Sequence, residues 1–140
     1  MNGKLDVEIV TQHGVVYRGA ADGLVAPGSA GYFGVLPRHA PMVADLGVGE
    51  LRVRHGDQWE RYALSGGVFH IRGGQAVVMA DAVEPLAEID AARAREAAQR
   101  ARDRLRRGPR DAEVDLSRAQ LALTRALNRL RLVGPSSIDS

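Results

Sequence analysis

Hydrophobic and polar residues alternate along several short stretches of the first 84 residues. In residues 5–10 and again in residues 50–55, apolar side chains fall on one face and charged side chains on the other. This period of two is typical of half-buried antiparallel strands, which have one face on the core and one in water. Similar patterns indicate further strands at residues 58–64, 68–71 and 75–80.

Glycine-containing segments separate these strands. His55-Gly56-Asp57 is a hairpin signal, and the pairs Gly66-Gly67 and Gly73-Gly74 are interpreted as turns on either side of residues 68–71. Several short strands at such close spacing predict a small β-sandwich or flattened barrel over residues 1–85.

The pattern changes after Pro85, where apolar residues recur every three or four positions and glycine is almost absent. A first helix is predicted over residues 86–106, with Glu88 and Asp90 at its start and arginines at its end, which suits the helix dipole. Gly108-Pro109 is expected to stop this helix.

A second helix is predicted over residues 112–132, opened by Asp111 and Glu113 and ended before Gly134-Pro135. Its predicted apolar stripe consists of Leu116, Ala119, Leu123, Ala126, Leu127 and Leu130. The two helices should form an antiparallel hairpin within residues 86–140, followed by a short disordered tail. Because the first helix offers mainly alanine to the seam, little apolar area is buried and the hairpin should be held only weakly.

Charge divides at the same boundary. Residues 1–85 carry seven Lys/Arg and nine Asp/Glu, whereas residues 86–140 carry twelve arginines and eight acidic residues. The formal net charge of +2 therefore conceals a slightly acidic β part and a basic helical part. The fold class predicted is mainly β followed by α.

Composition excludes several classes of function. The 140 residues include no cysteine, which rules out disulfides and thiol catalysis, and the four histidines show no close pairing that would favour a metal site. Neither a Walker motif nor a serine nucleophile elbow occurs. No apolar run is long enough to cross a bilayer, and the first residues do not resemble a signal peptide. These features predict a soluble, cytosolic and non-catalytic chain.

One long motif carries a family resemblance. Residues 25–44, Val-Ala-Pro-Gly-Ser-Ala-Gly-Tyr-Phe-Gly-Val-Leu-Pro-Arg-His-Ala-Pro-Met-Val-Ala, resemble the signature of the ε subunits of F-type ATP synthases. Residues 49–53, 64–68 and 89–94 add shorter matches, and the order of a β part before two helices agrees with the family. The chain departs from the family at the Gly-Pro between the predicted helices and in the tail after Leu132.

The resemblance implies a central-stalk subunit of a complex that makes ATP from ADP with a transmembrane ion gradient, normally of protons. Such subunits contain no catalytic site and require no cofactor. They contact γ and the ring of c subunits, and their helices extend toward the α/β hexamer to inhibit ATP hydrolysis. The implied location is peripheral, at the cytoplasmic face of the bacterial plasma membrane, with membrane association only through the complex.

The resemblance also implies a face that meets the c ring. The positions that match it are Ser29, Ala30, Gly31, Arg38 and His39. Pro37 and Pro41 hold the segment around His39 extended, which suits a rigid protein contact. The alternative explanation is a turn in which the imidazole hydrogen-bonds to a local carbonyl.

Some family members bind ATP on the helical hairpin, which stabilises its compact state. The matching positions are Glu84, Ile89, Asp90, Arg93, Ala94, Arg100, Arg125 and Arg129. Guanidinium groups suit phosphate oxygens, and a carboxylate can accept hydrogen bonds from the base or ribose. ATP is therefore implied as a regulatory ligand. The alternative explanation is that Asp90 and Arg93, three residues apart on a helix, form an ordinary surface ion pair.

The arginines of the second helix allow three interpretations. Those considered are Arg118, Arg125, Arg129 and Arg131. They form a solvated face, or they contact phosphates in a free-standing basic adaptor domain that binds nucleic acid, or they contact an acidic loop of the β subunits in the inhibitory state. Eight acidic residues and the absence of aromatic residues in the same region argue against nucleic acid. The resemblance favours the inhibitory contact.

Overall fold

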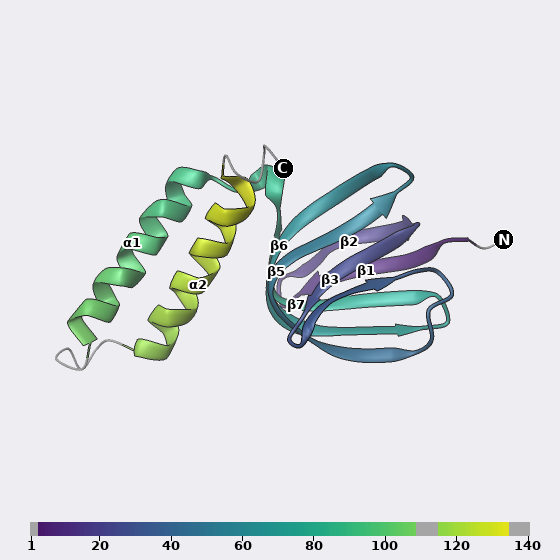
Figure 1. Ribbon diagram of the computed structural model, residues 1–140, viewed down its shortest axis with the longest axis horizontal. Coiled ribbons are helices and arrows are strands. Elements are labelled where there is room, and N and C mark those ends of the chain that lie inside the picture. Colours follow the sequence, from purple (N-terminus) through teal and green to yellow (C-terminus); the bar gives the residue numbers. More distant parts are fainter. Residues whose placement is uncertain (1–2, 109–114, 135–140) are drawn as a thin grey trace. The chain divides into compact units, whose positions relative to one another are not determined.

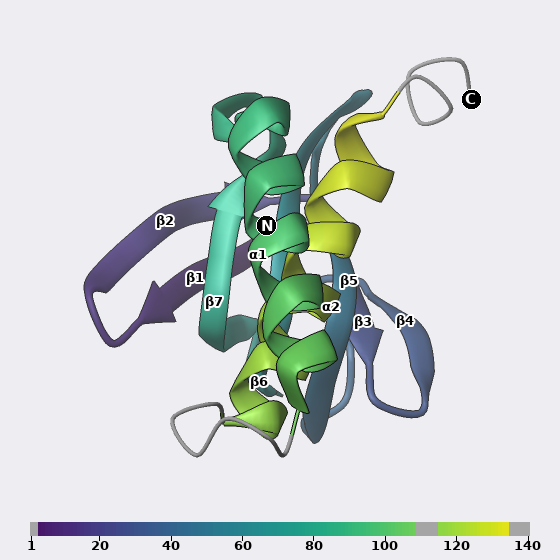
Figure 2. The same cartoon turned by 90° about the vertical axis from the view of Figure 1, so that its left-hand side faces the viewer.

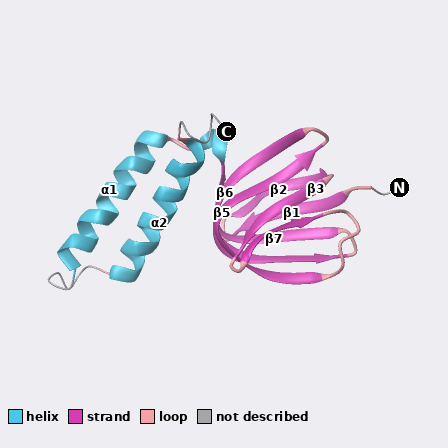
Figure 3. Ribbon diagram, viewed as in Figure 1, coloured by secondary structure: helices cyan, strands magenta, loops and turns pink. Residues whose placement is uncertain are grey.

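The computed structural model describes residues 3–108 and 115–134. The chain divides into two compact units, Met1–Pro85 and Leu86–Ser140. All the strands precede the helices in the chain (Figure 3). The predicted fold class, a β-sandwich followed by a helical hairpin, is confirmed.

Seven strands form one curved sheet in the first unit (Figure 1). Its order is β2-β1-β7-β6-β5-β3-β4, and all neighbours are antiparallel except β1 and β7, which run parallel. The strands are β1 (Leu5–Thr11), β2 (Gly14–Ala21), β3 (Gly23–Gly28), β4 (Gly31–Val35), β5 (Met42–His55), β6 (Gln58–Arg72) and β7 (Gln75–Pro85).

The core of this unit follows from the alternation in the sequence. Leu5, Val7 and Ile9 of β1 are fully buried, whereas the acidic residues between them point outward. The aromatic rings of Phe33 and Phe69 meet at 5.3 Å between centroids, in a tilted arrangement that aromatic pairs prefer. Because β5 and β6 are long and curved, their inward side chains contribute to the core along their whole length (Figure 1).

The two glycine pairs have different roles. Gly73 and Gly74, both with positive φ, form the turn between β6 and β7, as predicted. Gly66-Gly67 does not form a turn, and the prediction of separate strands at 58–64 and 68–71 is wrong. Both glycines lie inside the continuous strand β6 with φ of 77° and 135°, values that favour glycine. Pairing with β7 stays in register on both sides of them.

Asp22 joins the β2–β3 connection to the turn between β5 and β6. Its carboxylate accepts hydrogen bonds from the Lys4 side chain and, at 2.6 Å, from the backbone N–H of Gly56. Its own N–H donates to the carbonyl of Arg54 at 2.8 Å. The hydrogen bond from Lys4 is the largest cause of a lowered pKa for Asp22, followed by the one from Gly56.

The second unit begins with a short 3₁₀ helix, η1 (Leu86–Glu88), and then α1 (Ala91–Arg107). The prediction of one helix from residue 86 is therefore wrong at its start. Asp90 takes an extended backbone and its carboxylate caps α1 by accepting from the N–H of Arg93, which fixes the start of the helix at residue 91. Gly108, with φ of 52°, forms the C-cap, and its N–H donates to the carbonyl of Arg104.

The helix α2 (Leu116–Val133) has Asp115 as its N-cap. The predicted opening residues Asp111 and Glu113, Pro109 and the predicted disordered tail lie outside the described residues. Figures 1 and 2 both show α1 and α2 side by side. The buried positions Ala94, Ala98, Ala101, Ala119 and Ala126 give the hairpin a seam of small side chains.

The predicted apolar stripe of α2 is only partly covered. Ala119 and Ala126 are buried, but Leu116 and Leu127 are each 41% exposed. These exposed leucines agree with the expectation that a first helix with mainly alanine buries little of the stripe.

Candidate functional site

The outward face of the sheet carries a row of residues from four adjacent strands. Val43 on β5 pairs with His70 on β6, His70 pairs with Val77 on β7, and Val77 pairs with Glu8 on β1. Their neighbours along the strands, such as Phe69 and Val78, are buried in the core. Because side chains alternate between the two faces of a sheet, the row points away from the core.

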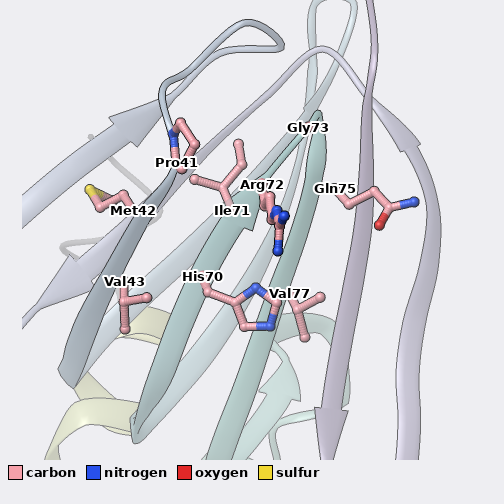
Figure 4. Close-up of a pocket in the computed structure, with 9 residues that line it drawn as sticks. All are labelled: Pro41, Met42, Val43, His70, Ile71, Arg72, Gly73, Gln75 and Val77. Carbon is pink, nitrogen blue, oxygen red and sulfur yellow. The ribbon is translucent and has the colours of Figure 1, made fainter.

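A groove with a volume of about 860 Å³ runs beside this row. Figure 4 shows the imidazole of His70 lying between Val43 and Val77, with Arg72 nearby on the same strand. The residues that line the groove are Pro41, Met42, Val43, His70, Ile71, Arg72, Gly73, Gln75 and Val77.

A second row, apolar except for Asp45 at one end, extends this surface. Asp45 on β5 pairs with Val68 on β6, Val68 with Met79 on β7, and Met79 with Val10 on β1. Met79 is 42% exposed, and Val43 in the first row is 74% exposed. We call these two rows together the outer sheet face, defined by Val10, Val43, Val68, His70, Val77 and Met79.

Charged side chains flank the outer sheet face. Glu8 forms an ion pair with Arg18 on the edge strand β2. Both residues also line a smaller hollow of about 370 Å³, which shares Gln75 and Val77 with the groove. The outer sheet face therefore has an apolar centre and a polar margin, which is the usual anatomy of a protein interface.

Sequence reasoning missed this face, although one signal was present. Residues 75–80, Gln-Ala-Val-Val-Met-Ala, have apolar side chains at successive positions rather than at alternate ones. Such strands are typically covered on both faces. Residues 43, 70 and 77 meet only through the register of the sheet, so no local motif indicates them.

The residues predicted to meet the c ring fall into two groups. Ser29 and Ala30 form the exposed connection between β3 and β4, and Gly31 is the first residue of β4, whereas Arg38 and His39 follow β4. The two groups therefore lie at opposite ends of β4, a strand of five residues. The N–H of Ser29 donates to the carbonyl of Asp45 at 2.9 Å, which ties the first group to β5.

His39 has the local contacts that the alternative explanation predicted. Its backbone N–H donates to the carbonyl of Leu36 at 2.9 Å, and its Nδ1 lies 2.7 Å from the carbonyl oxygen of Ala40. These contacts hold the loop in place. A role at the c ring stays a prediction.

The predicted nucleotide motif lies at the start of α1. One carboxylate oxygen of Asp90 accepts from the N–H of Arg93 at 3.1 Å, and the other lies 3.9 Å from Arg93 Nε. The N–H of Ile89 donates to the carbonyl of Leu86 at 3.1 Å, and Ala94 is buried. Helix capping therefore explains the position of the Asp90 carboxylate without a nucleotide. The Arg93 side chain forms only a loose ion pair with it.

The other predicted nucleotide ligands are spread more widely. Arg100 is exposed on α1, whereas Arg125 and Arg129 are half-buried on α2. Because α1 and α2 are antiparallel, the end of α2 that carries Arg129 lies beside the start of α1 (Figure 2). Glu84 is a half-buried residue of β7 in the first unit.

The four arginines of α2 do not share one face. Arg118, Arg125 and Arg129 follow a spacing of seven and four residues, which places them on one side of the helix. Arg131 projects from a different side and donates from Nη2 to the side-chain oxygen of Asn128 at 2.7 Å. A combined inhibitory surface must therefore use more than one side of α2.

Residues 3–108 and 115–134 contain neither a metal-binding cluster nor a membrane-spanning helix. No group of three or more His, Asp or Glu side chains has the geometry to hold a metal ion. Neither of the two α-helices in that part of the chain is long and apolar enough to span a membrane.

Known proteins match both units. The family described as the beta-sandwich domain of the ATP synthase Delta/Epsilon chain matches residues 4–86, and the family described as its long alpha-helix domain matches residues 87–134. The ATP synthase epsilon chain of Acidithiobacillus ferridurans is 43% identical over 101 residues, which cover 72% of each chain. That of Carboxydothermus hydrogenoformans is 45% identical over 107 residues, covering 76% of this chain and 80% of the relative.

Solved structures agree with the fold. A chain in the Euglena gracilis mitochondrial ATP synthase matches with a TM-score of 0.75 at 23% identity, covering 90% of this chain and 79% of that one. A chain in the central stalk and c ring of the Tetrahymena thermophila mitochondrial ATP synthase matches with a TM-score of 0.54 at 15% identity, covering 91% and 92%. None of these matches supports the alternative of a nucleic-acid adaptor.

Proposed function

The chain belongs to the ATP synthase delta/epsilon family, and from this premise we propose that its β-sandwich docks on γ and the c ring while its hairpin restrains ATP hydrolysis. It is an epsilon-type subunit of the central stalk, in the complex that makes ATP from ADP with a transmembrane ion gradient. Within that complex it has a structural and regulatory role, without catalytic residues of its own.

The proposal that the first unit docks on γ rests on the outer sheet face. Val43, with three quarters of its surface exposed, and Met79 lie among further apolar residues on four adjacent strands. Contiguous apolar patches rimmed by polar groups mark protein interfaces, because covering them removes apolar surface from water. A rigid sheet presents such a patch without an ordering cost at binding.

Contact with the c ring is assigned to the connections at the two ends of β4. Ser29, Ala30, Gly31 and Arg38 are exposed, and backbone hydrogen bonds of Ser29 and His39 hold both connections in place. Held loops of this kind suit recognition of another protein. The subunit is then peripheral at the cytoplasmic face of the bacterial plasma membrane and reaches the membrane only through the ring.

The hairpin is proposed to restrain hydrolysis by separating its helices and extending toward the α/β hexamer. Five of its buried side chains are alanines, with Asn128 and Leu132 added by α2, and alanine buries less apolar area than leucine and holds the helices together weakly. Arg118, Arg125, Arg129 and Arg131 then provide positive charge for an acidic loop of the β subunits. The attraction acts within about 8–10 Å at physiological salt.

ATP is proposed as a ligand that favours the compact hairpin. Arg93 is exposed at the start of α1, and Arg129 lies on the adjoining end of α2. Phosphate contacts from both helices would stabilise their closed arrangement by binding it preferentially. The carboxylate of Asp90 has one oxygen engaged in the helix cap and a second oxygen oriented toward Arg93.

Reconstitution of the catalytic complex tests the restraint. Complexes assembled with the full chain should hydrolyse ATP more slowly than complexes assembled with residues 1–85, while both chains bind the complex equally. The ratio of the two rates at equal occupancy is the measurement. Equal rates of ATP hydrolysis would show that the helical unit does not restrain the enzyme.

A further inference from the structure

Arg72 differs from the other strand arginines of the first unit. Arg18 pairs with Glu8, Arg61 pairs with Glu50, and Arg52 lies 4.9 Å from the ring centre of Trp59. Arg54 donates to backbone carbonyls. Arg72 is exposed and has no ion pair with any residue among 3–108 and 115–134.

The groove beside Arg72 has no carboxylate among its lining residues. Among its nine lining residues, all within the described part of the chain, Arg72 has the only side chain that is fully ionised at neutral pH. Two carboxylates on β1 share this face: Asp6 lies in the register row of Arg72, beyond Gln75, without an ion pair to it among the described residues, and Glu8 is paired with Arg18. The groove therefore combines an apolar floor with one positive charge that no neighbouring carboxylate neutralises.

A guanidinium in this position is complementary to a carboxylate. It presents parallel N–H donors that match the two oxygens of Asp or Glu, and such charge-assisted pairs are stronger than neutral hydrogen bonds. Phosphate would suit the guanidinium alone, but the neighbouring Val43 and Val77 favour a segment that also has an apolar side chain.

The strand geometry sets the spacing between these two features. His70 and Arg72 are two residues apart on β6 and project from the same face, so their Cα atoms are separated by about 7 Å. The row of Val43, His70 and Val77 lies at the level of His70. A matching segment therefore places its apolar side chain about 7 Å from its carboxylate, as residues i and i+2 of an extended chain do.

We propose that the groove receives a segment of the γ subunit that has an apolar side chain over Val43 and Val77 and a carboxylate paired with Arg72. This inference rests on the proposed docking of the outer sheet face on γ and specifies the chemistry of the contact. Charge complementarity with Arg72 sets the chemistry of that segment, an acidic side chain, and the proposed docking on γ supplies the partner. The apolar contact supplies most of the surface buried on binding. The ion pair fixes the position of the γ segment along the groove.

The test uses the full chain and the purified γ subunit of the same complex, with binding measured by interferometry at 50 and 300 mM salt. Val43→Asp and Arg72→Glu should each weaken binding at least tenfold. Arg72→Gln should weaken it about fivefold at low salt and remove most of the salt dependence. Arg52→Gln, which changes an arginine of β5 outside the groove, is the matched control and should bind within twofold of the parent.

The outcomes distinguish a failure of the proposed carboxylate contact with Arg72 from a failure of the proposed docking on γ. If Val43→Asp weakens binding but Arg72→Glu and Arg72→Gln bind like the parent, the carboxylate contact is wrong and the docking face stands. If none of these variants weakens binding, docking on γ through this face is wrong as well. If the chain self-associates and Arg72→Glu abolishes only that association, the occupant is a second copy and the inference is overturned. Circular dichroism of each variant confirms that it is folded.

Discussion

The Tyr17 hydroxyl oxygen lies 3.2 Å from Nε2 of His55, joining the edge strand β2 to the end of β5. These strands are not neighbours in the sheet, so the contact joins two parts of the sheet that strand pairing does not connect directly. The same imidazole nitrogen lies 2.6 Å from a carboxylate oxygen of Glu60. Burial raises the pKa of Tyr17, and the charge of Glu60 raises it further.

Tyr17→Phe should lower the free energy of unfolding by about 0.5–1.5 kcal/mol, because it removes the hydroxyl from this contact and keeps the ring. Urea unfolding at neutral pH measures the change. A double-mutant cycle with His55→Ala separates the pair from the ring packing, since the effect of Tyr17→Phe should become smaller when His55 is absent. Purely additive effects would show that the two groups do not interact.

The stability of the first unit should fall in acid partly through Asp22. Its pKa is lowered in the folded state, so its contribution is present above the unfolded value of about 3.9 and is lost as the pH falls through the folded value. Asp22→Asn should therefore reduce stability at pH 7 and flatten the loss below about pH 4. Asp57→Asn, in the exposed turn between β5 and β6, is the control. Parallel curves for Asp22→Asn and the parent would refute this role.

Gly67→Ala should destabilise the sandwich by about 1–3 kcal/mol, because an L-residue at φ of 135° is strained. The added Cβ would also lie 2.9 Å from the Cα of Ala80, on the backbone of β7. Gly34→Ala is the matched control on β4, since its Cβ would approach no atom closer than 3.9 Å. Equal midpoints in urea for the two variants would contradict the constraint.

Asp90→Ala should destabilise α1 by about 1 kcal/mol, whereas Asp90→Asn should be nearly neutral, because asparagine also caps helices. Thermal unfolding followed at 222 nm measures the difference. Asp115→Ala, which removes the equivalent cap of α2, should have an effect of similar size. A cap that contributes nothing would leave all three variants with the parent's midpoint.

Asp90→Asn also separates capping from nucleotide binding. If the carboxylate contacts ATP, Asp90→Asn should bind ATP at least tenfold more weakly while α1 keeps its stability, and Arg93→Ala should weaken binding similarly. Isothermal titration of the full chain with ATP is the measurement. The absence of heat from the parent chain would end the proposal that ATP is a ligand.

Local chemistry was enough to predict much of the fold. Alternation in residues 5–10 predicted the buried and exposed faces of β1, and the glycine pair Gly73-Gly74 predicted a turn, in which both residues have positive φ. Asp90 was expected near the start of the first helix, and the structure makes it the cap. Each of these features depends on residues close together in the sequence, where backbone sterics and hydrogen bonding act directly.

The remaining features depend on residues that are distant in the sequence. Gly66-Gly67 has the composition of a turn, but pairing with β5 and β7 on both sides keeps β6 continuous through it. The length of the alanine side chains on α1 leaves Leu116 and Leu127 exposed on α2. The sequence by itself determined that strands form at residues 5–10, 50–55 and 75–80 and that helices follow Pro85, whereas β2, β3 and β4 were not predicted. Only the register of the tertiary structure decided that Val43, His70 and Val77 lie together beside Arg72, because strand pairing joins residues that no local interaction connects.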